Sequence, residues 1–293
     1  MPIIQRSTIK AFLAVGAILV ASTALEATAD EPGNAERGAY VLRLGGCTAC
    51  HTDVKNKGAP LAGGAALKSP YGNFYAPNIT PDPETGIGRW STEDFIRAMT
   101  EGKPPSGLPY YPAFPYTSYA KMKRQDLIDL KSYLDTVKPV KHRAPENDLR
   151  FPYNIRLAIV GWRLLFFKPG PFVPDPAKSE SWNRGAYIVT GPAHCGECHS
   201  PRNFFGAVDQ SQALTGTNAG PEGKPIPGIT QHAKRGIGGW SKSDIVSLLE
   251  SGFMPDGDVV GGAMTEVIEN SSSHWTKEDR EAVADYLLSL PAR

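Results

Sequence analysis

A long internal repeat constrains the fold of this chain more than any other feature of its sequence. RGAY at Arg37–Tyr40 recurs at Arg184–Tyr187, and CTACH at Cys47–His51 recurs as CGECH at Cys195–His199. Further along, GIGRWS recurs as GIGGWS in nearly the same register. The copies lie about 150 residues apart, which is too long for one solenoid unit of about 20 to 50 residues. We therefore expect two copies of one small domain.

The repeat predicts the domain boundaries. We expect a first domain over residues 30–141, a second over 182–293, and a linker over 142–181 that lies outside the repeat and contains six prolines. Within the linker, residues 155–167 are apolar around most of a helical circumference, which is typical of a buried helix. Its apolar residues form two stripes at helical spacing, one of Ile155, Ile159, Trp162 and Phe166 and the other of Leu157, Val160 and Leu164. We expect this helix to pack between the two domains.

Helix signals occur at matching places in both copies. Ser91–Asp94 and Ser241–Asp244 have the [ST]-x-x-[DE] form of a helix start, and an apolar face follows each of them. A last amphipathic helix follows in each copy, with leucines at 127, 130 and 134 in the first. Between the helices lie long segments rich in the chain's 30 Gly and 26 Pro, without a useful alternation of strand type. The sequence therefore predicts an all-α fold of two tandem domains with extensive loops.

The first 29 residues have the form of a secretory signal peptide. Arg6 and Lys10 precede an apolar run over residues 11–24, and Ala27-Thr28-Ala29 has the small-residue pattern of a cleavage site. The apolar run has about fourteen residues, fewer than the roughly 20 that a membrane-spanning helix needs. We expect export to the periplasm, cleavage near Ala29 and no transmembrane helix in the mature chain.

Two C-x-x-C-H motifs carry the chemistry of the sequence. Two thiols three positions apart can bond to the two vinyl groups of one haem, and the adjacent His is placed to ligate its iron, which is the signature of c-type haem attachment. With two such motifs, the sequence predicts two covalently bound haem c groups. The candidate attachment and iron-ligating residues are Cys47, Cys50 and His51 in the first motif and Cys195, Cys198 and His199 in the second.

Other uses of the four cysteines fit the sequence less well. A four-cysteine zinc site would require the two motifs to converge and would leave both adjacent histidines as a coincidence. A thioredoxin-like redox pair requires a βαβ surrounding that the sequence lacks, and disulfides within a motif would be strained. Haem attachment is the use that accounts for both the cysteines and the histidines.

The chain resembles the class I cytochrome c family, and more narrowly the cytochrome c subunits of periplasmic and membrane-bound bacterial dehydrogenases for alcohols and sugars. The resemblance covers nearly the whole mature chain and rests on RGAYVLRLGGCTACH, NITPDPETGIGRWSTEDF, YYPAFPYTSY, WNRGAYIVTGPAHCGECHSPRN and GGAMTEVIENSSSHWTKEDREAVADYLLSLP. Such subunits usually have three haem motifs and a membrane attachment at their C-terminal end. The resemblance therefore implies a soluble two-haem carrier or a smaller subunit for this chain.

The resemblance also implies where the second axial ligand of each iron lies. In the family it is usually a methionine in the loop before the last helix, and Met264 in GGAMTEV matches that position better than Met254. In the first copy, Phe114 in PAFPY occupies the place where many relatives have methionine, and phenylalanine cannot bind iron. Met122 is the nearest methionine that could ligate the first iron instead. Alternatively, Met122 makes only a hydrophobic contact at the start of the last helix.

Three arginines are candidate partners of the haem propionates. Arg37 and Arg184 lie at equivalent places in the two RGAY motifs, and Arg202 follows the second haem motif. Guanidinium groups pair well with carboxylates, although a solvated surface position is the alternative for each.

These observations predict an electron carrier that is not itself an enzyme. We expect a periplasmic dehydrogenase as the donor and a soluble cytochrome or a terminal oxidase as the acceptor. The 31 basic and 30 acidic side chains leave no basic surplus, so nucleic acid is not an expected partner. The alternative is a haem enzyme of peroxidase or thiosulfate-oxidising type that uses an incompletely ligated first haem, and it is motivated by Phe114.

Overall fold

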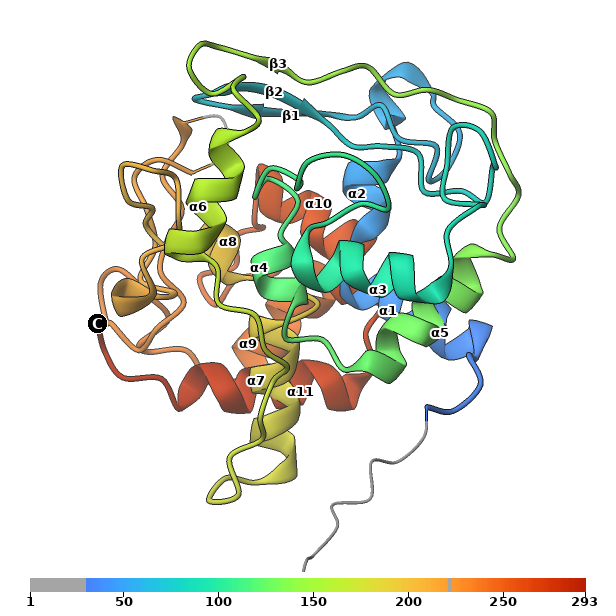
Figure 1. Cartoon of the computed structure of the whole chain (residues 1–293). Coiled ribbons are helices and arrows are strands. Elements are labelled where there is room, and N and C mark those ends of the chain that lie inside the picture. The colour runs from blue at the N-terminus through green and yellow to red at the C-terminus, as the bar shows by residue number, and fades with distance from the viewer. Residues whose placement is uncertain (1–29, 221–222) are drawn as a thin grey trace, which may run out of the picture. The chain divides into compact units, whose positions relative to one another are not determined.

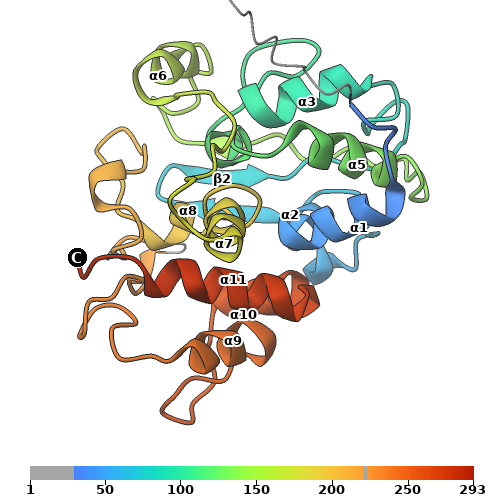
Figure 2. The same cartoon turned by 90° about the horizontal axis from the view of Figure 1, so that it is seen from below.

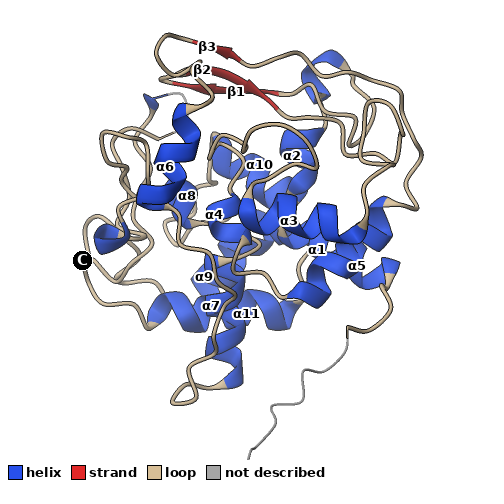
Figure 3. Cartoon of the chain, in the orientation of Figure 1, coloured by secondary structure: helices blue, strands red, loops and turns tan. Residues whose placement is uncertain are grey.

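A computed structural model describes residues 30–220 and 223–293, and most of its secondary structure is helical (Figures 1 and 3). The predicted signal peptide over residues 1–29 lies outside the described residues. The first half contains α1 (Ala35–Leu44), α2 (Cys47–His51), η1 (Val54–Asn56), α3 (Thr92–Glu101), α4 (Tyr116–Tyr119) and α5 (Arg124–Leu134). The connecting segment contains α6 (Ala158–Phe166). The second half contains α7 (Glu180–Thr190), α8 (Gly196–His199), η2 (Gln210–Gln212), α9 (Lys242–Ser251), α10 (Ala263–Asn270), η4 (Ser272–His274) and α11 (Lys277–Leu288).

Both predicted helix starts are confirmed. Ser91 caps α3 and Ser241 caps α9, each in a reciprocal capping box with the aspartate three residues later. Each of these helices ends at a glycine in the left-handed conformation, Gly102 with φ 62° and Gly252 with φ 82°. The repeat in the sequence is therefore a repeat of helices with the same local start and stop signals.

In each half, the helix of the RGAY motif crosses the last helix at very close range. The two pairs are α1 with α5 and α7 with α11, and Figure 2 shows α11 running across α7. A Cβ atom added to Gly38 would lie 1.9 Å from the backbone oxygen of Asp129, and one added to Gly185 would lie 1.9 Å from that of Ala282. The glycine of each RGAY motif is therefore needed for the contact between the helix backbones.

Two apolar cores hold the helices together. The first core consists of buried residues of the first half, namely Val41, Leu42, Leu61, Ile87, Phe95, Ile96, Met99, Tyr119, Met122, Leu127, Leu130 and Leu134. The second core consists of Leu44, Tyr187, Ile188, Val189, Leu214, Ile237, Ile245, Leu249, Trp275, Val283, Ala284 and Leu287. Leu44 belongs to α1 but packs in the second core, so the halves share apolar contacts. Residues Glu31–Arg293 form one compact unit.

The tyrosine of the first RGAY motif binds the last helix of the other half. The hydroxyl of Tyr40 accepts a hydrogen bond from the backbone N–H of Thr276 (3.0 Å) and donates one to the carboxylate of Asp279 (2.6 Å). Thr276 is the N-cap of α11 and Asp279 lies in its first turn. Tyr40 therefore satisfies polar groups at the start of a helix that lies more than 230 residues away in sequence.

The same arrangement holds with the roles of the halves exchanged. The hydroxyl of Tyr187 accepts a hydrogen bond from the backbone N–H of Lys123 (3.1 Å), the N-cap of α5, and donates one to Asp126 (2.5 Å) in the first turn of α5. Tyr187 is buried, and Lys123 contributes no side-chain cap of its own. Each half therefore caps the last helix of the other.

Replacing Tyr187 with phenylalanine is expected to lower the free energy of unfolding by about 1–3 kcal/mol. The substitution removes both hydrogen bonds and leaves the N–H of Lys123 and the carboxylate of Asp126 without this partner in a partly buried place. Denaturant unfolding followed by circular dichroism measures the change. Tyr133→Phe is the control, because the Tyr133 hydroxyl makes no hydrogen bond within residues 30–220 and 223–293. Equal losses in both variants would contradict the cross-capping role.

The expectation of a purely helical chain needs one correction. A small antiparallel sheet joins β1 (Ala66–Ser69), β2 (Gly72–Tyr75) and β3 (Asp148–Leu149) in the order β1-β2-β3. Two of the strands have four residues and the third has two, so they are too short for an alternating pattern to be visible in the sequence. Because β3 belongs to the connecting segment, the sheet ties that segment to the first half.

The prediction of a buried helix in the linker is wrong in one respect. Helix α6 contacts both halves, since Arg163 donates to the backbone oxygen of Glu101 and Trp162 donates to that of Phe205. Only one of its two apolar stripes faces the protein, however, and the other is solvent-exposed, with Leu164 83% exposed. Within the described residues, no helix has both the length and the apolar character that crossing a membrane requires.

Candidate haem sites

Both C-x-x-C-H motifs fold into short helices that follow a left-handed residue. Gly46, with φ 59°, precedes α2, and the equivalent position before Cys195 is His194, with φ 39°. Glycine adopts this conformation freely, whereas another residue there costs about 1 kcal/mol or more. His194 therefore holds a strained conformation that the first motif avoids.

The two motif histidines are oriented by identical hydrogen bonds. His51 Nδ1 lies 2.7 Å from the backbone oxygen of Pro77, and His199 Nδ1 lies 2.8 Å from that of Pro227. A carbonyl oxygen can only accept, so Nδ1 carries the proton and Nε2 is left free to bind a metal. Burial lowers the pKa of both imidazoles and favours their neutral form. Both side chains thus have the tautomer that an axial haem ligand needs.

The four motif cysteines are partly buried, and none of them is in a disulfide. Cys47 packs against the first core and Cys195 packs against the second. Burial is the main cause that raises the pKa of Cys47 and of Cys195 to about 12. These surroundings favour an uncharged sulfur, and the thioether that links a haem c is uncharged. The residues present therefore fit covalent haem.

The arrangement gives no support to the alternative uses of the cysteines. In the part of the chain that the structure describes, no group of three or more His, Cys, Asp or Glu side chains is arranged to hold a metal ion. No disulfide joins any of the four cysteines in the described residues.

Each predicted methionine lies beside the core of its own half. Met264, in the first turn of α10, is partly buried and packs against the second core, as does Cys195. Met122, 4% exposed in the turn between α4 and α5, belongs to the first core, against which Cys47 and Phe114 pack. Each methionine thus shares a core with the first cysteine of the motif that it is predicted to serve, and its role as an iron ligand stays a prediction.

The three arginines considered as propionate partners are engaged with carboxylates of the chain itself. Arg37 binds Asp129 (2.6 Å) and Arg184 binds Asp279 (2.7 Å), so both guanidinium groups reinforce the helix crossings. Arg202 binds the Glu197 carboxylate (2.7 Å) inside the second motif. These ion pairs hold α1, α7 and the second motif in place, and a role of the arginines as propionate partners stays a prediction.

Residues of the first half contact the second motif across the interface between the halves. Thr117 and Ser118 of the first half both donate to Glu197 of the second motif (2.9 and 3.0 Å). The ring of Tyr119 meets the ring of His194 edge-on, with centroids 5.6 Å apart. Tyr119 belongs to the first core and His194 directly precedes Cys195, so this contact links the surroundings of both motifs.

A second contact between the halves involves α10. This helix packs against α2, although it also carries Met264 of the second half. Burial raises the pKa of Cys50 to about 11, and electrostatic interactions with Glu266 in α10 and with Cys198 in the second motif raise it further. The second cysteines of the two motifs therefore lie near each other.

Several of these functional contacts could not be found from the sequence. Pro77 and Pro227 lie 26 and 28 residues after the histidines that they orient, and only their places in the repeat hint at a shared role. Tyr119 and His194 have no equivalent in the other copy and give no sequence signal.

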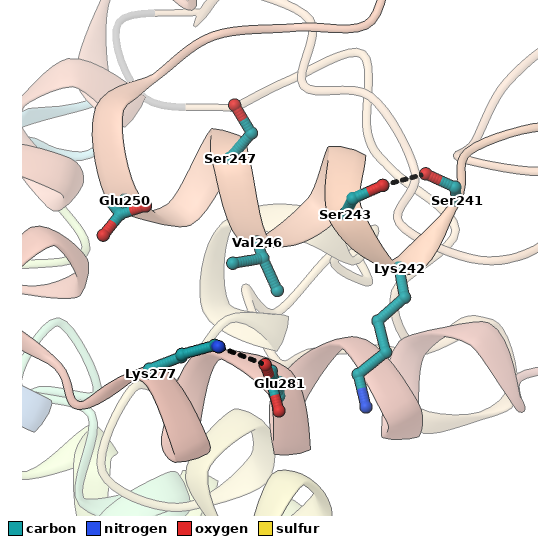
Figure 4. Close-up of a pocket in the computed structure, with 8 residues that line it drawn as sticks. All are labelled: Ser241, Lys242, Ser243, Val246, Ser247, Glu250, Lys277 and Glu281. Atoms are coloured by element: carbon teal, nitrogen blue, oxygen red, sulfur yellow. Dashed lines mark hydrogen bonds and ion pairs between the residues drawn. The ribbon is translucent and has the colours of Figure 1, made fainter.

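A shallow groove between α9 and α11 lies apart from both motifs (Figure 4). It is lined by Ser241, Lys242, Ser243, Val246, Ser247, Glu250, Lys277 and Glu281. The ion pair of Lys277 and Glu281 lies along α11, on one side of the groove. None of the motif cysteines, motif histidines or candidate methionines lines this groove, so it has no part in the proposed sites.

Comparison with known proteins decides the family. The cytochrome c family model matches residues 35–138. A protein of Cereibacter sphaeroides named "Diheme cytochrome c-type" is 44% identical over 264 residues, which cover 89% of this chain and 87% of the relative. The chain belongs to the cytochrome c family. As a cytochrome c with this pair of motifs, it is an electron-transfer protein that carries covalent haem c.

Other relatives of this cytochrome are named as parts of dehydrogenases. The cytochrome c subunit of the quinone alcohol dehydrogenase of Gluconacetobacter polyoxogenes is 39% identical over 288 residues, which cover 96% of this chain and 61% of the relative. A nicotinate dehydrogenase subunit of Pseudomonas putida is 43% identical over 256 residues, which cover 87% of this chain and 21% of the relative. The cytochrome thus spans less than two thirds of the length of each of these two proteins.

Proposed function

We propose that this cytochrome holds two haem c groups and carries electrons from a periplasmic dehydrogenase to a soluble cytochrome or a terminal oxidase. The observation that supports two haems most directly is the duplicated histidine geometry, in which His51 and His199 make equivalent Nδ1 hydrogen bonds to Pro77 and Pro227. The relatives named as cytochrome subunits of alcohol, fructose and gluconate dehydrogenases support the donor class.

The cysteines and the histidine of each motif have different roles in holding a haem. When bound, each haem supplies an iron centre that takes up and releases one electron. Cys47 and Cys50 in the first motif, and Cys195 and Cys198 in the second, anchor the group through thioether bonds. The two histidines present Nε2 to the iron and are kept from rotating by their Nδ1 hydrogen bonds. The two cores exclude water from one side of each site.

Met264 in the second half and Met122 in the first are the proposed second axial ligands. Replacing Met264 with alanine is expected to remove about half of the far-red absorbance that methionine ligation gives the oxidised protein. It should also lower one reduction potential on the order of 0.1 V, since axial ligands tune haem potentials over about 0.8 V. A visible spectrum and a redox titration measure both effects. Met254→Ala is the matched control, because Met254 lies in a turn closed by its hydrogen bond to Asp258. A change in the control alone would contradict the assignment.

The enzyme alternative depends on an incompletely ligated first haem. Phe114 packs against the first core, which agrees with its inability to serve as a ligand. Met122 is buried in that same core and offers a ligand in its place. The relatives are named as a dihaem cytochrome c and as the cytochrome c subunit of a dehydrogenase, so we propose electron transfer. In the oxidised protein, a high-spin haem that shifts on addition of cyanide would favour the enzyme instead.

The test of the proposed function is a reduction assay with the native periplasm. The purified ferric cytochrome is mixed with periplasmic fractions, each supplied in turn with alcohols, sugars or sugar acids. We expect one fraction to reduce it in the presence of one substrate class, and a soluble cytochrome or an oxidase preparation to reoxidise it. Failure of every fraction and substrate to reduce the cytochrome would contradict the proposal.

A further inference from the structure

Helix α6 and a neighbouring loop present an apolar face to solvent. We define the α6 patch as the six exposed side chains Leu157, Val160, Leu164, Leu165, Phe204 and Phe205. Leu164 is 83% exposed and Phe204 is 86% exposed, so these large side chains project from the surface and pack against little of it. Helix α6 lies at the edge of the molecule in Figure 2. Exposed clusters of this kind mark interaction sites in soluble proteins.

Aromatic contacts join α6 to the loop that carries Phe204 and Phe205. On the inner side of α6, Trp162 donates its indole N–H to the backbone oxygen of Phe205 (2.9 Å), and the ring of Phe166 lies 5.7 Å from that of Phe205. The ring of Phe204 lies 5.4 Å from that of Phe205. The stripe that contains Trp162 and Phe166 therefore holds α6 against the loop. The other stripe, which contains Leu164, stays exposed and is available for contact with another molecule.

The chain segment that carries α6 is basic between Asp148 and Asp175. Residues 149–174 contain Arg150, Arg156, Arg163 and Lys168 and no acidic residue. In the described part of the chain, none of these four groups lies within 4.0 Å of a carboxylate. Arg156 donates instead to the backbone oxygens of Leu108 and Pro109, and its charge is not neutralised there. A partner that covers the patch gains most if its rim is acidic.

The patch lies directly beside the second haem motif. Phe204 and Phe205 follow His199 by only a few residues, and Arg202 ties their loop to the motif through Glu197 and through the backbone oxygen of Gly206 (2.7 and 2.8 Å). A protein that docks on the patch is therefore brought close to Cys198 and its haem. Such proximity is what an electron donor requires.

We propose that the α6 patch is the docking surface for the catalytic subunit of the dehydrogenase, with an apolar contact at its centre and acidic side chains of that subunit around it. The inference rests on the proposed function and makes the second haem site the point of electron entry. In the nicotinate dehydrogenase relative, the matching region is 21% of a much longer polypeptide, so a related cytochrome module is built beside a large protein neighbour. An apolar centre with arginine nearby is typical of protein interfaces.

The test uses the haem-loaded cytochrome and the dehydrogenase purified by its ability to reduce it. In one variant Leu164, Leu165 and Phe204 are all replaced by serine, and in a second Lys168 is replaced by glutamate. We expect KM for the cytochrome to rise about tenfold or more in the first and about threefold in the second, with kcat at saturation unchanged. Val54→Ser and Lys55→Glu are the matched controls, since both side chains are exposed in η1, outside the patch. Haem content and melting temperature show that each variant is folded.

Three outcomes would overturn the docking surface. The first is an unchanged KM in both patch variants while the wild-type cytochrome is reduced normally, which leaves the proposed function intact. The second is flotation of the wild type, but not of the triple variant, with phosphatidylglycerol-containing vesicles at unchanged KM, which assigns the patch to a membrane surface. The third is a wild-type dimer that the triple variant abolishes, again at unchanged KM, which assigns it to a second copy of the chain. If no dehydrogenase reduces the wild type, the proposed function itself fails.

Discussion

Serine at both Cys195 and Cys198 is expected to give a protein that carries one covalent haem instead of two. Serine cannot form the thioether bond, and the other attachment motif lies in a separate core with its own histidine. Half of the haem absorbance per protein, and the mass of one haem, should therefore be lost on purification under denaturing conditions. The first motif should still take up its haem, because Cys47 packs against the first core and not the second.

The reciprocal variant provides the control. Serine at both Cys47 and Cys50 should also remove one haem, and the variant with four serines should contain none that survives acidic acetone extraction. Pyridine haemochrome assays and intact-protein mass spectrometry give the counts. An unchanged haem content in either double variant would contradict the two-haem proposal, and so would an unchanged content in the variant with four serines.

Alanine at Gly38 or at Gly185 is expected to destabilise the protein by about 3 kcal/mol or more. The new Cβ would lie 1.9 Å from a backbone oxygen of the opposing helix, and a backbone atom cannot move aside as a flexible side chain does. The two helices of the crossing must separate, and the buried contacts along them are lost together. Each variant therefore affects a whole helix pair.

Denaturant unfolding of the haem-loaded protein measures this effect. Gly239→Ala is the matched control, because a Cβ at Gly239 meets no atom within 4 Å and the residue has no positive φ. The control is expected to differ from the wild type by well under 1 kcal/mol. Equal stabilities of the Gly38 variant and the control would show that the crossing tolerates a side chain.

Local signals in the sequence predicted much of the helical framework. The capping boxes that begin α3 and α9 depend only on residues three positions apart, so they are visible without knowledge of the fold. The strands β1 and β2 were missed because four residues are too few to show a period. The exposure of Leu164 was missed because a helix that is apolar all round gives no indication of which side is covered.

Some features of the candidate sites could likewise be predicted from the sequence, and others depend on the fold. Cysteines 47 and 50 could be named from the sequence, because covalent attachment to one haem fixes their spacing. The carbonyl of Pro77 could not be named, because any residue has one and only the fold brings it to His51. The link between Tyr119 and His194 depends on how the halves pack, which no local pattern encodes.

The exchanged tyrosine contacts have a consequence for how the two halves can change over time. Because Tyr40 caps α11 and Tyr187 caps α5, the halves meet through the same surface used twice, as in an isologous homodimer whose subunits have been joined into one chain. A substitution on this shared surface in one half also disturbs the other half. Neither half can therefore change its sequence there independently of the other. Outside these tyrosine contacts the copies have diverged: PAFPY has no methionine to match Met264, and α6 lies outside the repeat.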